Sequence, residues 1–287
     1  ITSQQLLIAS WNVNSIRTRF YQVKDFLENN KIDILCLQET KVSNNDFPVK
    51  DFEALGYRVK FSGQKSYNGV AIISKFEFQD CKIDFIGELN ENQVAKEYLD
   101  QKRIISALIN DIRIINVYVP NGSSLGSEKY KYKLAWLDLF YKYLKKQKER
   151  NELTCILGDF NIAPNSNDIC DPEKYEGGIM ASNLEREALS KILKEEFIDT
   201  FRVFEKGSGF WSWWDYRKNS YELNKGWRID HIYINNNLLP HLKSSVIASS
   251  QRGNEQPSDH APVVINLTFD EADTNYNNDD DDDIFAL

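Results

Sequence analysis

The sequence predicts a single α/β domain in which paired strands form mixed sheets that pack on one another. One observation is the number of short apolar runs, rich in β-branched residues, that follow one another with few helices between them. A second is that no segment within residues 1–269 has the composition of a linker. A third is that the chain shows neither a Gly-rich phosphate loop nor a regular strand–helix alternation, which disfavours a dinucleotide-binding or P-loop fold.

The first part of the chain predicts four strands and one helix. Apolar residues at helical spacing, ending in Asn29-Asn30, predict a short amphipathic helix over 20–29. The last two strands are joined by a loop rich in Gly and Ser, which indicates a strand pair. The expected strands are 5–10, 32–38, 57–61 and 69–74.

The rest of the chain continues this pattern with two longer helices. A broad apolar stripe with lysines opposite predicts a helix over about 128–149. The capping box Ser182-x-x-Glu185 predicts the start of a helix that runs to about 196. A dense aromatic cluster lies within 207–221. The expected strands are 104–109, 112–119, 154–157, 227–234 and 261–267.

The segment TCILGDFN, residues 154–161, combines a buried strand with two polar side chains. We expect Gly158 to end the strand and Asp159 and Asn161 to project together from its end. A buried Asp there can accept a proton, and an Asn amide can donate to a developing oxyanion. The alternative is an Asx-turn in which both side chains cap the backbone. Because several other strands end in the same way, we favour the functional interpretation.

Polar residues at strand ends form a set of hard oxygen donors with one histidine and no cysteine. Such a set suits Mg²⁺ or Mn²⁺, and it is what hydrolysis of a phosphoester requires. Of the three histidines, His260 alone stands at a strand start, where an Asp can hold it protonated beside a phosphate, whereas His231 is expected to face away from Asp230. The set is Asn12, Asn14, Glu39, Tyr118, Asn121, Asp159, Asn161, Asp230, Asp259 and His260.

The net charge of −8 does not exclude a nucleic-acid partner. Eight of the 43 acids lie in residues 270–287, where there is no Lys or Arg, which leaves 35 acids against 35 Lys and Arg in the body of the chain. The segment DEADTNYNNDDDDDIFAL has few apolar residues and a block of like charge, so we expect it to be disordered. We therefore expect a folded domain over 1–269 and a disordered acidic tail over 270–287.

The sequence also bears on compartment and oligomeric state. No apolar run approaches the length of a membrane span, and the polar start ITSQQ is not typical of a signal peptide, so we expect no membrane association. Cys36 and Cys155 lie in apolar strands and no CxxC pair occurs, which indicates reduced thiols and disfavours zinc. We expect a monomer in the cytoplasm or nucleoid, or in the nucleus of a eukaryote.

Seven segments together resemble the signature motifs of the exonuclease III family of abasic-site endonucleases, in the order and with the spacing of that family. SWWDYR and GWRID point to its DNA-repair branch rather than to relatives such as DNase I, sphingomyelinases and inositol phosphatases. The resemblance covers residues 5–268. The segments are WNVNSIR (11–17), LQETK (37–41), VYVPNG (117–122), LGDFN (157–161), SWWDYR (212–217), GWRIDHIY (226–233) and PSDHAPV (257–263).

The resemblance implies a four-layer α/β sandwich, with two mixed sheets face to face and helices outside. It implies Mg²⁺-dependent cleavage of the phosphodiester 5′ of abasic sites that leaves a 3′-OH, with Mn²⁺ as a substitute. It also implies 3′-phosphodiesterase or 3′-phosphatase activity and some 3′→5′ exonuclease activity. The implied partner is double-stranded DNA with abasic sites or blocked 3′ ends.

The same resemblance implies roles for the catalytic residues. Asp159 would be the base that orients and deprotonates water, and Asn161 a donor to the scissile phosphate. Asp230 would hydrogen-bond His260, which contacts the phosphate, and Tyr118 would be a further phosphate contact.

The resemblance further implies metal and DNA contacts. Glu39 would be the principal metal ligand, with Asn12 beside it and Asp259 near the metal. A small apolar slot would admit a flipped-out sugar without a base and exclude a normal nucleotide. The residues that would hold the DNA backbone are Asn14, Arg17, Arg103, Asn121 and Lys133, and those that would line the slot are Trp213, Trp227 and Ile229.

Alternatives remain open for several of these residues. Trp213 and Trp227 also fit core aromatics, and Lys133 lies on a lysine-rich helix whose solvated face is an alternative to a phosphate contact. Where mammalian-like members have a DNA-inserting Arg, this chain has Ser123-Ser124-Leu125.

Two other functions fit the sequence less well, and the acidic tail has two interpretations. A phosphodiesterase of the same fold acting on lipid or nucleotide headgroups is disfavoured because no apolar or basic insertion is evident. A catalytically idle DNA-binding protein is disfavoured because every reactive position is filled. The acidic tail is either a solvated end or a segment that docks on a basic groove, of a protein partner or of this protein's own DNA face.

Overall fold

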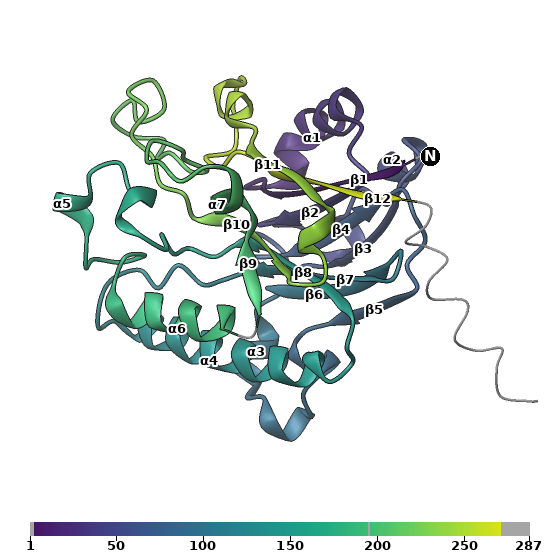
Figure 1. The fold of residues 1–287 in the computed structure, drawn as a ribbon, viewed down its shortest axis with the longest axis horizontal. Helices are drawn as coiled ribbons and strands as arrows, with labels where there is room; N and C mark the ends of the chain where they lie inside the picture. The colour runs from purple at the N-terminus through teal and green to yellow at the C-terminus, as the bar shows by residue number, and fades with distance from the viewer. Residues whose placement is uncertain (1–2, 195, 271–287) are drawn as a thin grey trace, which may run out of the picture.

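The structure, a computed structural model, describes residues 3–194 and 196–270. In this part of the chain two six-stranded mixed sheets lie face to face (Figure 1). The first sheet has the order β11 (Leu242–Ile247), β12 (Val263–Asp270), β1 (Ser3–Asn12), β2 (Ile34–Gln38), β4 (Val70–Ser74) and β3 (Arg58–Ser62). The second has the order β5 (Asp80–Ile83), β6 (Ile104–Ile109), β7 (Ile112–Tyr118), β8 (Leu153–Asp159), β10 (Asp230–Asn235) and β9 (Phe197–Asp199).

Each sheet has one parallel pair at its centre, β1 with β2 and β7 with β8, and its other described pairings are antiparallel. The carboxyl ends of a parallel pair lie at the same edge of a sheet, so each sheet offers two adjacent strand ends there. Asn12 is paired with Gln38 at the end of the first pair, and Tyr118 with Asp159 at the end of the second.

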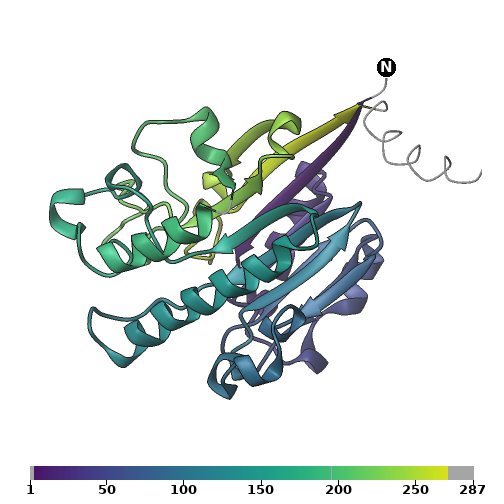
Figure 2. The ribbon, with the colours of Figure 1, turned by 60° about the horizontal axis from the view of Figure 1, so that its bottom comes forward.

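Three apolar clusters separate four layers. Residues such as Ile8, Ile34, Ile114 and Leu157 fill the space between the sheets. Outside the first sheet lie α1 (Ile16–Asn30) and α2 (Val49–Ala54), which contribute Phe26 and Phe52 to a second cluster. Outside the second sheet lie α3 (Lys96–Asp100), α4 (Glu128–Lys148) and α6 (Asn183–Leu193), and Figure 2 shows the long α4 beside the strands. The expected four-layer sandwich is therefore confirmed.

The strand that carries Asp159 extends further than expected. Gly158, expected to end the strand, lies within β8 and is paired with Val117 and His231. Its φ is 145°, and a Cβ atom there would stand 1.9 Å from the carbonyl oxygen of Val117. Only glycine lets β8 pass this close to β7, so the strand continues to Asp159.

Other elements differ from expectation for identifiable reasons. The strands β5, β9 and β11 were missed because they are edge strands that are only partly buried, so their apolar pattern is weak. Four short helices were also missed, namely α2, α3, α5 (Pro172–Tyr175) and α7 (Thr200–Phe204). The strand expected over 227–234 begins only at Asp230.

The end of the described chain bears on the expected domain boundary. The last strand, β12, continues to Asp270, one residue past the expected end of the domain. The expected tail beyond it, residues 271–287, lies outside the described residues.

Two further observations concern the described residues alone. The thiols of Cys36 and Cys155 are buried and free, as expected, and Cys81 and Cys170 are free and half-buried. Across residues 3–194 and 196–270, none of the helices combines the length and the apolar character needed to cross a bilayer.

Candidate active site

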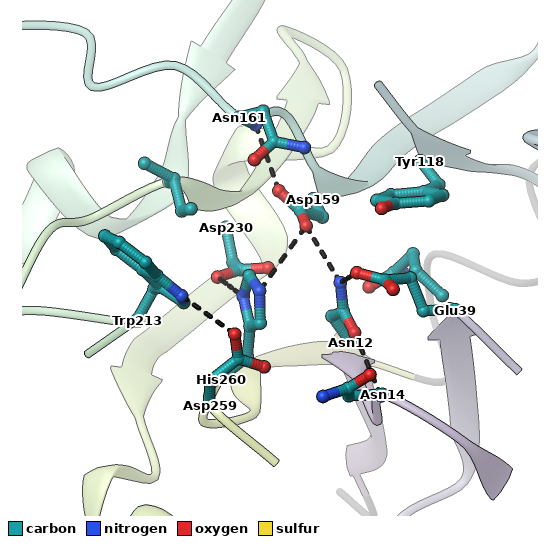
Figure 3. Close-up of polar contacts among 12 residues, drawn as sticks. Asn12, Asn14, Glu39, Tyr118, Asp159, Asn161, Trp213, Asp230, Asp259 and His260 are labelled. Carbon is teal, nitrogen blue, oxygen red and sulfur yellow. Dashed lines mark hydrogen bonds and ion pairs between the residues drawn. The ribbon is translucent and has the colours of Figure 1, made fainter. Parts of the chain in front are cut away.

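The ends of six segments converge where the two sheets meet at one edge. The parallel pairs deliver Asn12, Tyr118 and Asp159, and Glu39 follows β2 directly. β10 begins opposite Asp159, and His260 precedes β12. Figure 3 shows the polar side chains of these segments pointing toward one another around Asp159.

Asn12 links the two sheets. Its side chain is fully buried, and its Nδ2 donates to Glu39 Oε1 and to Asp159 Oδ2, both at 2.9 Å (Figure 3). Its Oδ1 accepts the backbone N–H of Asn14 at 3.0 Å. In this orientation the Asn12 atom that faces the carboxylates is a donor, so Asn12 orients Glu39 and Asp159, and its expected role as a metal ligand stays a prediction.

Asp159, His260 and Asp230 form a chain of buried titratable groups. His260 Nδ1 lies 2.8 Å from Asp230 Oδ2, and its Nε2 lies 3.6 Å from Asp159 Oδ2 (Figure 3). Burial raises the pKa of Asp159 to about 7, with the carboxylates of Asp230 and Glu39 acting in the same direction and the His260 charge opposing it. Asp159 is thus poised to exchange a proton near neutral pH.

His260 is held in its charged form. Burial lowers the pKa of the imidazole, but the carboxylates of Asp230, Asp159 and Asp259 outweigh burial and hold the pKa well above its ordinary value. A protonated imidazole carries an N–H on both ring nitrogens; Nδ1–H donates to Asp230, and Nε2–H, 3.6 Å from Asp159 Oδ2, has no hydrogen bond to the described residues. His260 can therefore offer a cationic donor at this edge of the sheets.

Glu39 is more accessible than Asp159 and Asp230, with a side chain 20% exposed. Burial raises the pKa of Glu39, but the Asn12 hydrogen bond and the charges of Lys41 and His260 more than offset it and hold the pKa below its ordinary value. Glu39 is therefore ionised at neutral pH, as a ligand for a hard cation must be.

Within residues 3–194 and 196–270, one group of side chains could hold a metal ion. Ligand atoms of Glu39, Asp159 and His260 lie within 4.8 Å of one another. Because His260 is protonated, the oxygens of Glu39 and Asp159 are the usable donors, and two carboxylates fit Mg²⁺, which keeps waters around it. Asp259, expected near the metal, is not in this group, and its Oδ2 accepts the Trp213 Nε1–H at 3.0 Å.

Asn161 combines the two alternatives drawn from the sequence. Its backbone N–H donates to Asp159 Oδ1 at 3.0 Å, which is the Asx-turn, and its φ of 50° takes it out of the extended strand. The turn places its amide beside Asp159 all the same (Figure 3). Here Nδ2 donates to the carbonyl of Val119 at 2.8 Å.

An apolar cluster lies next to the acids. Trp227 and Ile229 are buried, and the rings of Trp213 and Trp227 meet edge to face at 6.5 Å. Trp213 and Trp227 both belong to this cluster. They are therefore packed as core aromatics and also form the surface that could line the expected slot for the sugar. The loop before α6 adds residues that sequence reasoning missed, Ile169 and Met180. The signal available for them was two short apolar runs, Ile169-Cys170 and Ile179-Met180-Ala181, in an otherwise polar loop.

Arg228 anchors the segment that carries Trp227 and Ile229, and it was missed. Its buried guanidinium donates to Asp168 at 2.7 Å and to Asp199 at 2.6 Å, and its backbone N–H donates to the Asp168 carbonyl. Asp168 belongs to the loop before α6, so this ion network joins both sides of the apolar cluster.

Comparison with known proteins identifies the family to which this chain belongs. The sequence profile of the Endonuclease/Exonuclease/phosphatase family matches residues 9–260. The chain belongs to this family. An exodeoxyribonuclease III of Haemophilus influenzae is 33% identical over 266 residues, which are 88% of this chain and 97% of that protein. The relatives place the chain in the exonuclease III branch of abasic-site endonucleases within the family.

Solved structures of the family agree with the fold. The Neisseria 3′ phosphatase NExo, solved with a product DNA hairpin, superposes with a TM-score of 0.86 at 36% identity, covering 92% of this chain and all of that one. An AP endonuclease of Archaeoglobus fulgidus gives a TM-score of 0.84 at 40% identity, covering 91% of this chain and 98% of that one.

The residues expected to hold DNA in this family member fall into two groups. Asn14 and Arg17 lie in the loop and first turn of α1, where Arg17 is largely exposed and stands 3.7 Å from Asp46. Asn14 Nδ2 donates to the Tyr216 hydroxyl, and its Oδ1 accepts from Lys41 Nζ at 2.5 Å. Lys41 was missed although it closes the LQETK motif.

The second group lies around Tyr118. Burial raises the pKa of Tyr118 well above its ordinary value, and the Glu39 charge adds to this, so it remains a neutral phenol. The Arg103 guanidinium stacks 4.6 Å from the Tyr118 ring and donates to its carbonyl at 3.1 Å. Asn121 Nδ2 donates to Asn161 Oδ1 at 3.4 Å. Arg103 therefore supports Tyr118 in this structure.

Lys133 corrects both expectations held for it. It is neither on a solvated face nor exposed to a phosphate, because its side chain is completely buried and paired with Glu185. Burial lowers the pKa of Lys133, although the Glu185 carboxylate acts in the opposite sense. The lysine-rich pattern of α4 concealed one lysine that turns inward.

Proposed function

We propose that this protein is a Mg²⁺-dependent DNA-repair hydrolase that cleaves the phosphodiester 5′ of abasic sites in duplex DNA and leaves a 3′-OH. We include 3′-phosphodiesterase or 3′-phosphatase activity and some 3′→5′ exonuclease activity. The observation that carries the proposal is Asp159, a buried carboxyl with a pKa of about 7 beside a cationic His260 and an ionised Glu39. Relatives named as an exodeoxyribonuclease III, a 3′ phosphatase and an AP endonuclease support it.

In the proposed reaction Asp159 accepts a proton from a water molecule whose oxygen attacks the phosphorus. The P–O3′ bond breaks, and the departing 3′ oxygen takes a proton from solvent. His260, held by Asp230, donates to a phosphoryl oxygen whose negative charge grows, and Asn161 supplies an amide donor beside it. Glu39 would hold the Mg²⁺, for which Mn²⁺ substitutes, and the bound cation would neutralise phosphate charge.

Selection of the abasic nucleotide is assigned to the apolar cluster. Trp213, Trp227 and Ile229 present a small apolar surface next to Asp159, which suits a deoxyribose that carries no base. A nucleotide with its base would be too large for this surface. Asn14, Arg17 and Asn121 are proposed to contact the flanking phosphates.

The remaining assignments concern setting and partners. We propose that the protein acts as a monomer on double-stranded DNA with abasic sites or blocked 3′ ends. We place it in the cytoplasm or nucleoid, or in the nucleus of a eukaryote. Residues 271–287 are proposed as an acidic segment that either stays solvated or competes with DNA phosphate, most strongly at low salt.

The test uses a labelled duplex with one abasic site, incubated with Mg²⁺ or with EDTA, beside an intact duplex. The wild-type protein nicks the abasic strand on the 5′ side of the lesion only with Mg²⁺, and Asp159→Asn does not. The matched control is Asp80→Asn, which alters a carboxylate paired with Arg113 away from the site and keeps full activity.

Two results would contradict the proposal. Binding of the duplex without nicking would indicate an idle DNA-binding protein. Neither binding nor nicking would direct the search to other phosphodiester substrates.

A further inference from the structure

The buried lysine of α4 has a role that the proposed mechanism does not use. Lys133 Nζ donates to the carbonyl of Asn161 at 2.7 Å, to the carbonyl of Asn121 at 3.1 Å and to a carboxylate oxygen of Glu185. An ammonium group has three N–H donors, so each of them has a partner. Two of the three partners are backbone atoms of residues whose side chains face the site.

Glu185 extends this connection to the apolar cluster. It lies in the first turn of α6, where it forms the capping box with Ser182. The oxygen that pairs with Lys133 also accepts the backbone N–H of Met180 at 3.1 Å, and the other accepts the Ser182 hydroxyl at 2.7 Å. The pair thus joins α4 and α6 to three loop segments that border the site.

The backbone that the pair holds is unfavourable by itself. Asn161 and Met180 have φ values of 50° and 66°, in the left-handed region that residues with a Cβ adopt rarely. Such conformations persist where surrounding contacts determine them. Gly122 packs closely on the same lysine, because a Cβ atom there would stand 3.0 Å from Lys133 Cδ.

General energetics argue against a purely stabilising role. A buried ion pair loses hydration and is often no more stable than an apolar pair of the same size. An apolar pair would fill the space between α4 and α6 but would leave the carbonyls of Asn121 and Asn161 without a donor. The ion pair, unlike an apolar pair, fixes the backbone carbonyls of Asn121 and Asn161 through hydrogen bonds from Lys133.

We propose that the Lys133–Glu185 pair is a positioning device that orients the Asn161 and Asn121 amides relative to Asp159. The inference rests on the proposed hydrolysis at this site. Lys133 touches no substrate in this account, and it acts through the backbone of the two asparagines. Because misplacement of a reacting group by about 1 Å costs about 100-fold in rate, we expect the pair to affect kcat strongly.

The test compares two double variants of the full chain. Lys133→Met/Glu185→Gln removes both charges, keeps the volume and leaves an amide oxygen in place of the carboxylate to cap α6. The matched control, Arg113→Met/Asp80→Asn, removes another ion pair, between the buried Arg113 and the partly exposed Asp80, whose atoms lie 3.0 Å apart at the opposite end of β7; Glu152, the second carboxylate beside Arg113, is kept. The expected kcat on the abasic duplex is about 100-fold lower in the first variant and unchanged in the control. KM changes less than kcat.

A second readout is independent of activity. Backbone amide exchange, followed by mass spectrometry, is expected to accelerate over 119–123 and 159–163 in the Lys133 variant but not in the control. Accelerated exchange with an inactive wild-type protein would refute the proposed function and leave the positioning role standing. A kcat that falls no more than in the control, or unchanged exchange in these segments, would overturn the inference.

Discussion

A buried histidine gives a direct test of the electrostatics beneath the site. His231 follows Asp230 in β10 but faces away from it, as expected, and its Nδ1 accepts from the Tyr233 hydroxyl at 2.8 Å. Complete burial, with the nearby Arg228 charge acting in the same direction, lowers the pKa of His231 from 6.5 to about 4. Folding therefore requires a neutral imidazole here.

The sign and size of the effect follow from proton linkage. Between pH 4 and pH 6.5 the unfolded chain binds a proton at His231 and the folded chain does not, so stability is lost as the pH falls through this window. One pKa unit corresponds to about 1.4 kcal/mol, so the interval from 6.5 to about 4 corresponds to about 3 kcal/mol. This contribution is fully present above pH 6.5.

Asp159 acts in the opposite direction, because its folded pKa of about 7 exceeds the ordinary 3.8. The folded chain therefore gains stability from this group as the pH falls below 7. The contribution of His231 is consequently measured as a difference between proteins, with His231→Gln as the variant that keeps a donor and an acceptor but does not titrate.

The assay is urea unfolding followed by tryptophan fluorescence at several pH values. From pH 7 to pH 4 the wild-type free energy of unfolding is expected to fall by about 3 kcal/mol relative to that of His231→Gln. A relative change below about 1 kcal/mol would refute the reasoning, because His231 would then titrate almost equally in both states.

Three further substitutions test the fold, the metal site and the slot. Gly158→Ala is expected to lower the free energy of unfolding by more than about 3 kcal/mol, measured by urea unfolding, because its Cβ would meet the Val117 carbonyl at 1.9 Å; a wild-type value would contradict the close approach of β7. Glu39→Gln is expected to abolish Mg²⁺-stimulated nicking and to weaken Mn²⁺ binding in calorimetry. If Mn²⁺ binding were retained, residues other than Glu39 would hold the metal. Ile229→Ala enlarges the apolar slot and is expected to raise cleavage of intact relative to abasic duplex by about tenfold; an unchanged ratio in gel assays would refute the slot.

Much of the architecture could be predicted because its signal is local. The central strands are fully buried, so their apolar runs marked β2, β4 and β7 within a few residues. Three of the four edge strands, β5, β9 and β11, are half-exposed and carry no such run, and the sequence did not reveal them; the fourth, β3, was expected over 57–61. Gly158 misled because its local signal is that of a break, whereas the reason for the glycine lies in β7, distant in sequence.

The candidate site could also be predicted where its signal is local, and it could not be predicted where a side chain depends on residues distant in sequence. Asp159, Asp230 and His260 stand at strand ends, and strand direction alone brings such ends together. The orientation of the Asn12 amide depends on which atoms surround it, which no sequence pattern records. Lys133 and Arg228 were misjudged or missed because their partners, Glu185 and Asp168, lie far along the chain.

The pairing of β1 with β12 has a consequence for how the protein comes into being. Ser3 lies opposite Asp270, so the backbone groups along one edge of β1, the first described strand, have no partners until β12, the last described strand, has been made. His260 lies three residues before the start of β12 at Val263. During synthesis, therefore, Asp159 and Asp230 cannot contact His260 until nearly the whole domain has left the ribosome. A chain that ends before His260 lacks β12, exposes an unpaired β1 edge and has no complete nuclease centre.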